Sequence, residues 1–185
     1  MNAYYDTGVL LPLYVKEVFS DAITGLAESR YEAIPFNLFQ QLEMETAIRL
    51  KLFRGEIDSP RVQAIIADRD EDMRSGRLVL RSVDWIRAME EGRRLGAQAT
   101  GRHGCRTLDL VHVAIAIQWQ CAVFVTTDDR QLKAARSAGL KTIDVRTLER
   151  PGRPGGAQSE PPTGTVQEKR ARYGSVKRRR SAGSK

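Results

Sequence analysis

The sequence predicts an α/β fold in which a parallel sheet is covered by helices on both faces. Short β-rich runs alternate with amphipathic helical segments along the first 150 residues. The 185 residues suffice for one domain and a remainder, and 41% hydrophobic with 29% charged residues are globular proportions. We therefore predict a folded domain over residues 1–149 and a separate tail over residues 150–185.

The predicted domain begins with a strand, a helix and a second strand. Residues 2–6 combine aromatic side chains with a terminal acid and stop at a Thr-Gly break, after which residues 9–15 are apolar. A serine is a favourable helix start and predicts a helix over residues 20–31. Residues 32–35 are a brief candidate strand.

Two long helices follow, and each carries a start signal. Asn37 and Gln40 have the spacing of a capping box, which predicts a helix that ends near Gly55. Pro60 follows a serine and suits the first helical position, because the N–H that proline lacks would have no partner there. The apolar residues after Pro60 keep helical spacing.

The chain then returns to a strand and a helix. Residues 78–83 are rich in β-forming side chains and predict the next strand. Asp84 is a helix-start residue, and the helix that it begins is expected to weaken around Gly96 and to end before the loop at residues 101–104.

The last part of the domain repeats the alternation. Thr107 begins a helix whose centre, residues 110–117, is almost entirely apolar and is therefore expected to be buried. Residues 122–126 predict a strand, residues 129–138 a helix that a following glycine stops, and residues 141–145 a final strand.

The charge of the chain is concentrated in the predicted tail. Residues 151–185 hold nine Lys or Arg and two Glu, so they account for the whole net charge of +7. The preceding part is formally neutral. Because the tail consists largely of Pro, Gly, Ser, Arg and Lys and has few side chains to bury, we expect it to be disordered.

Membrane and metal-finger classes find little support in the sequence. No apolar run approaches the roughly 18 residues that cross a bilayer, and no signal peptide is evident, so we expect a cytoplasmic protein. Cys105 and Cys121 form no Cys-x-x-Cys pair, and we expect two reduced thiols near the core. His103 with Cys105 lacks the further ligands that a zinc site needs.

Four acidic residues stand where a ligand site is expected. In open parallel sheets ligands bind at the carboxyl ends of strands, and Asp6 and Asp128 each follow a predicted strand. Asp109 lies in the first turn of the most apolar helix, and Glu43 has apolar neighbours on another. No Lys or Arg in these segments is expected to neutralise them locally. Converging carboxylates repel without a cation, and oxygen ligands suit Mg²⁺ or Mn²⁺.

Each of these acids also has a purely structural explanation. Asp109 could favour the helix dipole, Asp128 could cap the next helix, and Glu43 could be solvated. Glu45, two positions further along the helix, must face elsewhere. Asp6 is the hardest to explain structurally, because a carboxylate that enters the core without a partner is costly.

At these residues the sequence resembles the PIN-domain nucleases and, within them, the VapC-type toxins of bacterial toxin–antitoxin modules. The resemblance extends from Tyr4 to about Val145, which is nearly all of the predicted domain. Its segments are YDTGVL at 5–10, LEMETA at 42–47, RTLDLVHVA at 106–114 and FVTTD at 124–128, followed by Ala-Ala at 134–135 and Gly-Leu at 139–140.

The resemblance implies a three-layer α/β/α sandwich with a central parallel sheet and the hydrolysis of RNA phosphodiesters. Asp6, Glu43, Asp109 and Asp128 would be the quartet that binds one or two Mg²⁺ or Mn²⁺ ions, with Thr126 as a nearby hydroxyl. The metal would activate water for in-line attack without a covalent enzyme intermediate. The sequence departs from many relatives at position 8, where Gly replaces Ser, and Asp129 beside Asp128 complicates the fourth ligand.

Several other polar residues are assigned more weakly. His112 follows Asp109 by three positions, and relatives carry a histidine there that packs and supports a ligand, so we assign it no general-base role. Arg106, Arg130 and Lys133 flank the acids and could touch the RNA backbone, although solvated surface charge is an equally good explanation.

The basic tail offers a second RNA-binding hypothesis. Its arginines and lysines can neutralise phosphates without reading sequence, and Tyr173 could stack on a base. Solubilising disorder explains the same composition. The tail residues that we predict to bind RNA are Arg170, Arg172, Arg178, Arg179 and Arg180.

Two rival functions are weighed against the nuclease. A haloacid-dehalogenase-like phosphatase needs a second Asp two residues after the first, and Gly8 occupies that position. A non-catalytic RNA-binding or scaffold protein would use the same fold and the basic tail, but it would not need all four acids. The toxin resemblance also implies a small antitoxin partner that inserts an amphipathic helix, and a homodimer.

Overall fold

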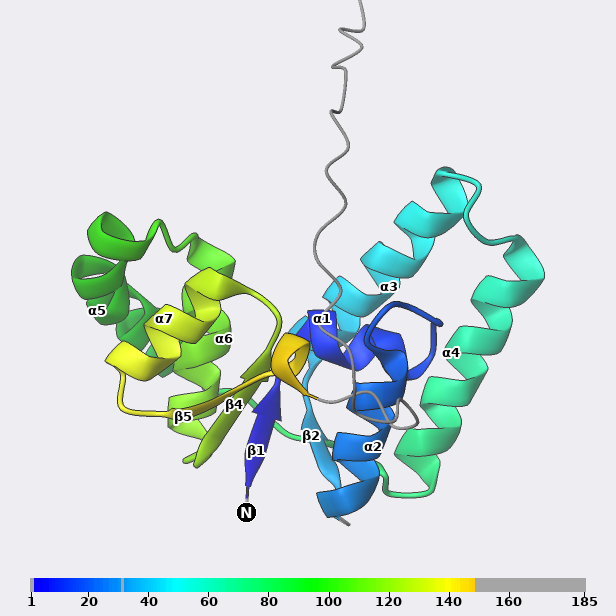
Figure 1. Cartoon of the computed structure of the whole chain (residues 1–185), viewed down its shortest axis with the longest axis horizontal. Helices are drawn as coiled ribbons and strands as arrows, with labels where there is room; N and C mark the ends of the chain where they lie inside the picture. The colour runs from blue at the N-terminus through cyan, green and yellow to red at the C-terminus, as the bar shows by residue number, and fades with distance from the viewer. Residues whose placement is uncertain (1, 31, 149–185) are drawn as a thin grey trace, which may run out of the picture. The chain divides into compact units, whose positions relative to one another are not determined.

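The computed structural model describes residues 2–30 and 32–148, and within them the strands form two parallel groups (Figure 1). The first group has the order β1-β4-β5, and in the second β2 pairs with β3. The predicted parallel sheet is therefore present as two parts, which meet where β1 contacts β2 without strand pairing. The strands are β1 (Ala3–Tyr5), β2 (Ile34–Phe36), β3 (Leu78–Leu80), β4 (Val123–Thr126) and β5 (Lys141–Asp144).

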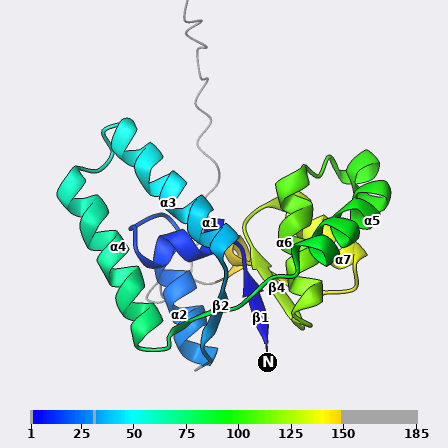
Figure 2. The ribbon, with the colours of Figure 1, turned by 180° about the vertical axis from the view of Figure 1, so that it is seen from behind.

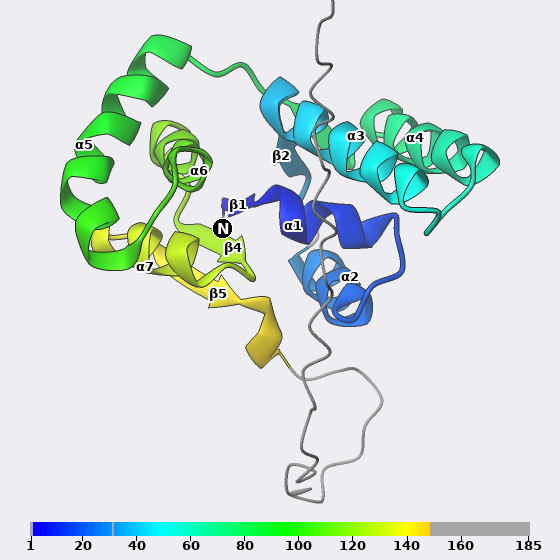
Figure 3. The same ribbon diagram turned by 90° about the horizontal axis from the view of Figure 1, so that it is seen from above.

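Helices cover both faces of the strands, as predicted. Alternate strand residues point to opposite faces, and Tyr4 and Phe124 join one buried cluster while Tyr5 and Val125 join another. Figure 3 shows the two helical groups on either side of β1 and β4. One group is α1 (Thr7–Leu10), the 3-10 turn η1 (Leu11–Leu13), α2 (Ser20–Arg30), α3 (Leu38–Phe53) and α4 (Ser59–Arg74). The other is α5 (Trp85–His103), α6 (Thr107–Gln118) and α7 (Asp129–Ser137).

The chain passes from one helical group to the other after β3. Figure 2 follows it from α4 through β3 to the start of α5. The indole Nε1 of Trp119 donates to the Ser82 carbonyl at 3.1 Å, and the Arg81 guanidinium lies 4.8 Å from the Trp119 ring centre. These contacts fix the crossing segment against the end of α6.

Most helix ends follow the predicted signals. Asn37 and Gln40 form the capping box of α3, with Gln40 N–H donating to Asn37 Oδ1 at 2.9 Å. Gly139 has a φ of 83° where α7 ends, as the helix-stop signal predicted. The start of α4 is shifted, because Asp58 rather than Ser59 accepts the capping hydrogen bond, from Arg61 N–H at 2.9 Å.

The predicted end of the helix after Asp84 was wrong. α5 continues past Gly96 and Gly101 to His103, and it ends at Gly104, whose φ is 67°. Gly96 is instead a packing residue: a Cβ there would lie 3.3 Å from Leu110 Cδ1, so the glycine lets α5 approach α6 closely. The first strand ends before the Thr-Gly pair, as predicted, and this pair starts α1, because Asp6 caps that helix.

The strands are shorter than predicted, and other details agree. β2 covers residues 34–36 instead of 32–35, and β3 ends at Leu80 instead of residue 83. Both cysteines are buried free thiols. No helix among residues 2–30 and 32–148 is long and apolar enough to span a membrane. The predicted tail lies outside the described residues.

Candidate active site

Asp6 is a buried carboxylate at the carboxyl end of β1, and the backbone places it there. Its N–H donates to the Val125 carbonyl of the neighbouring β4 at 3.1 Å, which continues the strand pairing by one residue. Oδ1 accepts from Val9 N–H at 2.8 Å, and Oδ2 accepts from the Thr126 hydroxyl at 2.5 Å. The residue is 3% exposed.

Burial raises the pKa of Asp6 to about 6, because a charged carboxylate is poorly solvated in the core. His112 and the hydrogen bonds from Thr126 and Val9 lower this pKa, whereas the charge of Asp128 raises it. The opposing influence of Asp128 shows that the acids which follow β1 and β4 lie close enough to repel each other.

Asp128 follows β4 and caps α7, as its structural explanation anticipated. Oδ1 accepts from the backbone N–H groups of Arg130 at 2.7 Å and Gln131 at 3.2 Å. Burial raises the pKa of Asp128, but these bonds and the Arg130 guanidinium outweigh it and hold the pKa below its ordinary value. Asp128 N–H also donates to the Thr126 hydroxyl oxygen at 2.9 Å, so Thr126 joins Asp6 to the Asp128 backbone.

Asp109 is held in the first turn of α6. Its Oδ2 accepts from Arg106 N–H at 2.8 Å, which closes the helix start, and the residue is 8% exposed. The Arg130 Nε lies 3.5 Å from the same oxygen, and Arg130 Nη2 lies 2.9 Å from Asp128 Oδ2. Arg130 therefore bridges Asp109 and Asp128. The expectation that no nearby cation neutralises these acids was wrong.

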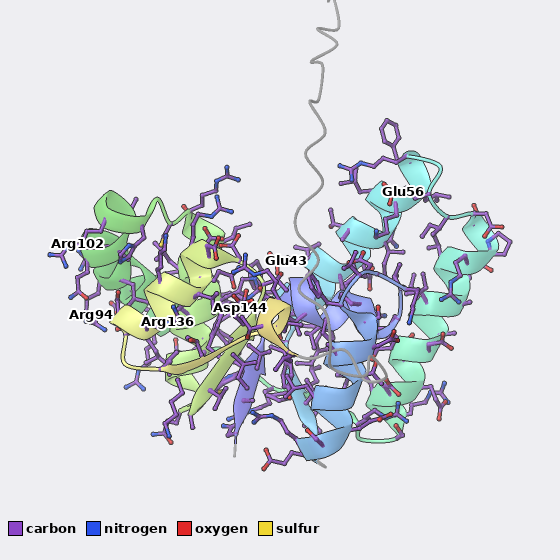
Figure 4. The ribbon with its side chains drawn as sticks, in the orientation of Figure 1. Glu43, Glu56, Arg94, Arg102, Arg136 and Asp144 are labelled. Atoms are coloured by element: carbon purple, nitrogen blue, oxygen red, sulfur yellow. The ribbon has the colours of Figure 1, made fainter. Side chains whose placement is uncertain are left out.

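Glu43 projects from α3 toward α1 and α6. Its Oε2 accepts from the Thr7 hydroxyl at 2.5 Å and lies 3.0 Å from His112 Nε2. Figure 4 shows Glu43 beside α1, whereas Glu56 lies just beyond the far end of α3. Glu45 faces elsewhere, as predicted, and lies 2.8 Å from Arg69 of α4.

The chemistry of this donor set fits a divalent cation, although the ligands are not assembled around one point. Carboxylate oxygens are the ligands that Mg²⁺ and Mn²⁺ prefer. Within the described residues, Glu43 makes these contacts through Oε2 and Asp109 through Oδ2. Glu43 Oε1 and Asp109 Oδ1 therefore keep their lone pairs for a cation. Among the described residues, no three or more His, Cys, Asp or Glu side chains are close enough to hold a metal ion. Binding would require Arg130 to leave Asp109 and Asp128.

The structure places the predicted acids in two groups, one with Asp6, Asp109 and Asp128 and the other with Glu43 alone. Asp6 and Asp128 meet through Thr126, Asp109 and Asp128 through Arg130, and Glu43 lies against His112. The assignment of all four as metal ligands stays a prediction. Of the basic candidates, Arg106 and Lys133 are exposed and Arg130 is paired. Arg170, Arg172, Arg178, Arg179 and Arg180 lie outside the described residues.

Sequence reasoning missed two members of the site. Thr7 donates to Glu43, and the only sequence signal for it is a hydroxyl residue directly after the acid that ends β1. The Tyr4 hydroxyl lies 2.8 Å from His112 Nδ1 across a separation of 108 residues, which no local pattern indicates. Gly8 sits beside the site: a Cβ there would lie 3.5 Å from Asp6 Oδ1, an ordinary contact distance that leaves room for the serine of relatives.

The chain was compared with known proteins at the levels of sequence and structure. No protein-family model and no curated protein matches the chain. Among solved structures it is similar to the crystal structure of FitAcB from Neisseria gonorrhoeae, with a TM-score of 0.55 and 13% sequence identity. The match covers 79% of this chain and 99% of that chain. The chain has a PIN-like fold. The PIN-like fold is the predicted three-layer α/β/α arrangement, and the acids that follow β1 and β4 lie at the carboxyl edge of its sheet.

Proposed function

We propose that this PIN-like protein is a ribonuclease that depends on Mg²⁺ or Mn²⁺ and is the toxin component of a toxin–antitoxin module. The observation that carries the proposal is the position of Asp6 and Asp128 at the carboxyl ends of two neighbouring parallel strands. Asp109 and Asp128 share Arg130, and Glu43 lies 3.0 Å from His112 of α6, the helix that also carries Asp109.

Each residue of the edge has a role in this proposal. Asp6, Glu43, Asp109 and Asp128 hold the cation, which when bound activates water and offsets charge on the phosphate during in-line hydrolysis. Thr126 orients Asp6 by donating to Oδ2 at 2.5 Å.

The neighbouring basic residues serve the RNA backbone in the same proposal. Arg106 precedes α6 and Lys133 lies in the middle of α7; both side chains are exposed and can contact phosphates. Arg130 joins them once a cation has taken its place between Asp109 and Asp128.

The partner part of the proposal is an antitoxin and a second copy of the chain. It is supported by the PIN-like fold, by the likeness to FitAcB and by apolar side chains left on the surface of one helix. Leu38 and Leu42 of α3 are each 65% exposed and stand four residues apart, so they share a face. Exposed apolar side chains that cluster mark protein contacts more often than isolated ones do.

The test is cleavage of single-stranded RNA by purified protein. We expect cleavage with Mg²⁺ or Mn²⁺, none with EDTA, and at least a hundredfold loss, on the order of one catalytic group, in an Asp6→Asn variant. Asp58→Asn is the matched control, because Asp58 caps α4 away from the site and asparagine caps a helix equally well. Equal cleavage by both variants would contradict the proposal.

A second candidate function is non-catalytic RNA binding, and the Arg130 bridge favours it. An arginine between Asp109 and Asp128 neutralises acids that a nuclease needs free for its cation. A scaffold protein would bind RNA in EDTA and would release no cleavage product with either metal ion. Metal-dependent cleavage that Asp6→Asn abolishes excludes this function.

A further inference from the structure

We propose that the buried hydroxyl of Tyr4 is a positioning group for Glu43 and acts through the imidazole of His112. The inference rests on the proposed function, because Glu43 is a metal ligand only there. Tyr4 lies in β1 and His112 in α6, so the connection brings two layers of the fold to one ligand on α3.

A row of short polar contacts supports the proposal. The Tyr4 hydroxyl lies 2.8 Å from His112 Nδ1, and His112 Nε2 lies 3.0 Å from Glu43 Oε2. In the proposal Nε2 carries the ring hydrogen that faces Glu43, because a carboxylate can only accept, and Nδ1 accepts from Tyr4. The tyrosine hydroxyl thereby selects the tautomer that binds Glu43.

Both rings in the row are rigidly placed. Tyr4 is fully buried and stacks on Phe124 with ring centres 5.3 Å apart. His112 is 3% exposed and lies 5.0 Å from the Phe39 ring centre. A phenylalanine would pack equally well at position 4, so the hydroxyl has a role besides packing.

The row constrains a side chain that would otherwise be free. Glu43 has three side-chain torsions and is only half-buried on α3, so packing alone does not fix its carboxylate. The Thr7 hydroxyl donates to Oε2, and His112 Nε2 lies 3.0 Å from the same oxygen, which holds the carboxylate in one orientation and keeps Oε1 for a cation. Groups that orient metal ligands in this way typically change metal affinity by 10–100-fold, about the range expected here.

The experiment compares Tyr4→Phe with Tyr5→Phe in the full chain. Tyr5 is the next residue of β1 and is buried on the opposite face, so it controls for loss of a buried hydroxyl from the same strand. We expect Tyr4→Phe to weaken Mn²⁺ binding, measured by calorimetry, roughly tenfold. We expect Tyr5→Phe to leave Mn²⁺ binding unchanged.

A second readout is independent of metal and activity. The chain has two histidines, so ¹⁵N spectra of the imidazoles are assigned with one His103→Gln variant. In metal-free wild type we expect His112 with its hydrogen on Nε2, and in Tyr4→Phe we expect its ring signals to shift toward a tautomer mixture. Unchanged His112 signals in Tyr4→Phe would overturn the proposal.

Double substitution separates positioning from a general loss of structure. In a Glu43→Gln background, Tyr4→Phe should have no further effect on Mn²⁺ affinity, whereas a loosened core would weaken it again. If wild type binds Mn²⁺ and Tyr4→Phe binds it equally well, the positioning role is overturned alone. If wild type binds no Mn²⁺ and cuts no RNA, the proposed function fails, and the role of Tyr4 as a positioning group fails with it.

Discussion

Burial of the ionised Asp6 carboxylate lowers the stability of the folded chain. Its pKa rises from 3.8 to about 6 chiefly through burial. The folded chain thus keeps the Asp6 proton to a higher pH than the unfolded chain does, and the free energy of unfolding falls as pH rises from about 4 to about 6. Above pH 6 the ionised carboxylate costs about 3 kcal/mol of stability, since one pKa unit corresponds to about 1.4 kcal/mol.

We therefore predict that Asp6→Asn stabilises the protein while it abolishes activity. An amide does not ionise, so in EDTA the variant should be more stable than wild type by up to about 3 kcal/mol at pH 7, but close to wild type at pH 4. Urea unfolding at the two pH values measures the difference. An equal change of stability with pH in both proteins would show that Asp6 is not the group responsible.

The Arg130 guanidinium competes with any cation for Asp109 and Asp128. Its side chain is 34% exposed, so its ion pairs are weak enough to exchange. We predict that Arg130→Gln binds Mn²⁺ roughly threefold more tightly than wild type in calorimetry without RNA. Arg146→Gln is the control, because Arg146 pairs with Asp129 and Asp144. Weaker Mn²⁺ binding by Arg130→Gln would mean that the arginine organises the ligands.

At the residue scale, the sequence identified what lies next to strand ends and helix starts. Asp6, Asp109 and Asp128 could be found because Asp6 and Asp128 follow strands and cap the next helices, and Asp109 lies in the first turn of α6. The Arg130 bridge and the Tyr4–His112 contact depend on side-chain rotamers and on packing between distant segments. Neither leaves a periodic signal in the sequence.

At the element scale, helices were more predictable than strands. The α3 helix was expected from Asn37 and Gln40, whose side chains form both bonds of the capping box. The strands are three or four residues long and owe their limits to pairing with distant partners, such as β1 with β4. Such pairing is absent from local sequence, which is why the division between β1 and β2 and the order β1-β4-β5 were not anticipated.

The α3–α4 hairpin that carries Glu43 is held together by a buried arginine. Arg69 of α4 is 3% exposed, and its Nη1 donates to Glu45 Oε1 of α3 at 2.8 Å. Hydrogen bonds from Arg69 and Gln41 hold the pKa of Glu45 at about 2. Glu43 and Glu45 face different partners, so the same helix presents one acid to the site and another to its neighbour.

We predict that Arg69→Met lowers the free energy of unfolding by about 1–3 kcal/mol. This is below the cost of breaking a fully buried pair, because Glu45 remains partly exposed and keeps Arg49 at 3.0 Å. Arg74→Met serves as control, since Arg74 lies on the surface of the same helix and pairs only with Glu71 in the described residues. Urea unfolding measures both; equal stabilities would show that the hairpin does not depend on Arg69.

At the scale of the whole molecule, charge and chemistry occupy different parts of the chain. The described residues hold the acids of the candidate site, whereas the net charge of +7 comes from residues 151–185. A near-neutral domain attracts polyanionic RNA weakly, and a basic segment adds affinity that does not depend on sequence. RNA affinity and RNA cleavage should therefore be separable by substitution.

We predict that changing Lys177, Arg178, Arg179 and Arg180 to Gln weakens RNA binding in EDTA and flattens its salt dependence. The slope of log affinity against log salt should fall by up to about 3, at roughly 0.7 for each lost phosphate contact with a single strand. Cleavage at saturating RNA should be unchanged, because no site acid is altered.

Four exposed arginines on the outer side of α5 provide the matched loss of charge for this test, and Figure 4 shows two of them, Arg94 and Arg102. The control changes Arg87, Arg93, Arg94 and Arg102 to Gln. If net charge alone attracts RNA, both sets of substitutions will reduce the salt slope equally. A larger reduction by the tail set shows that the tail contacts phosphates directly. An unchanged slope in both variants would show that the tail does not bind RNA.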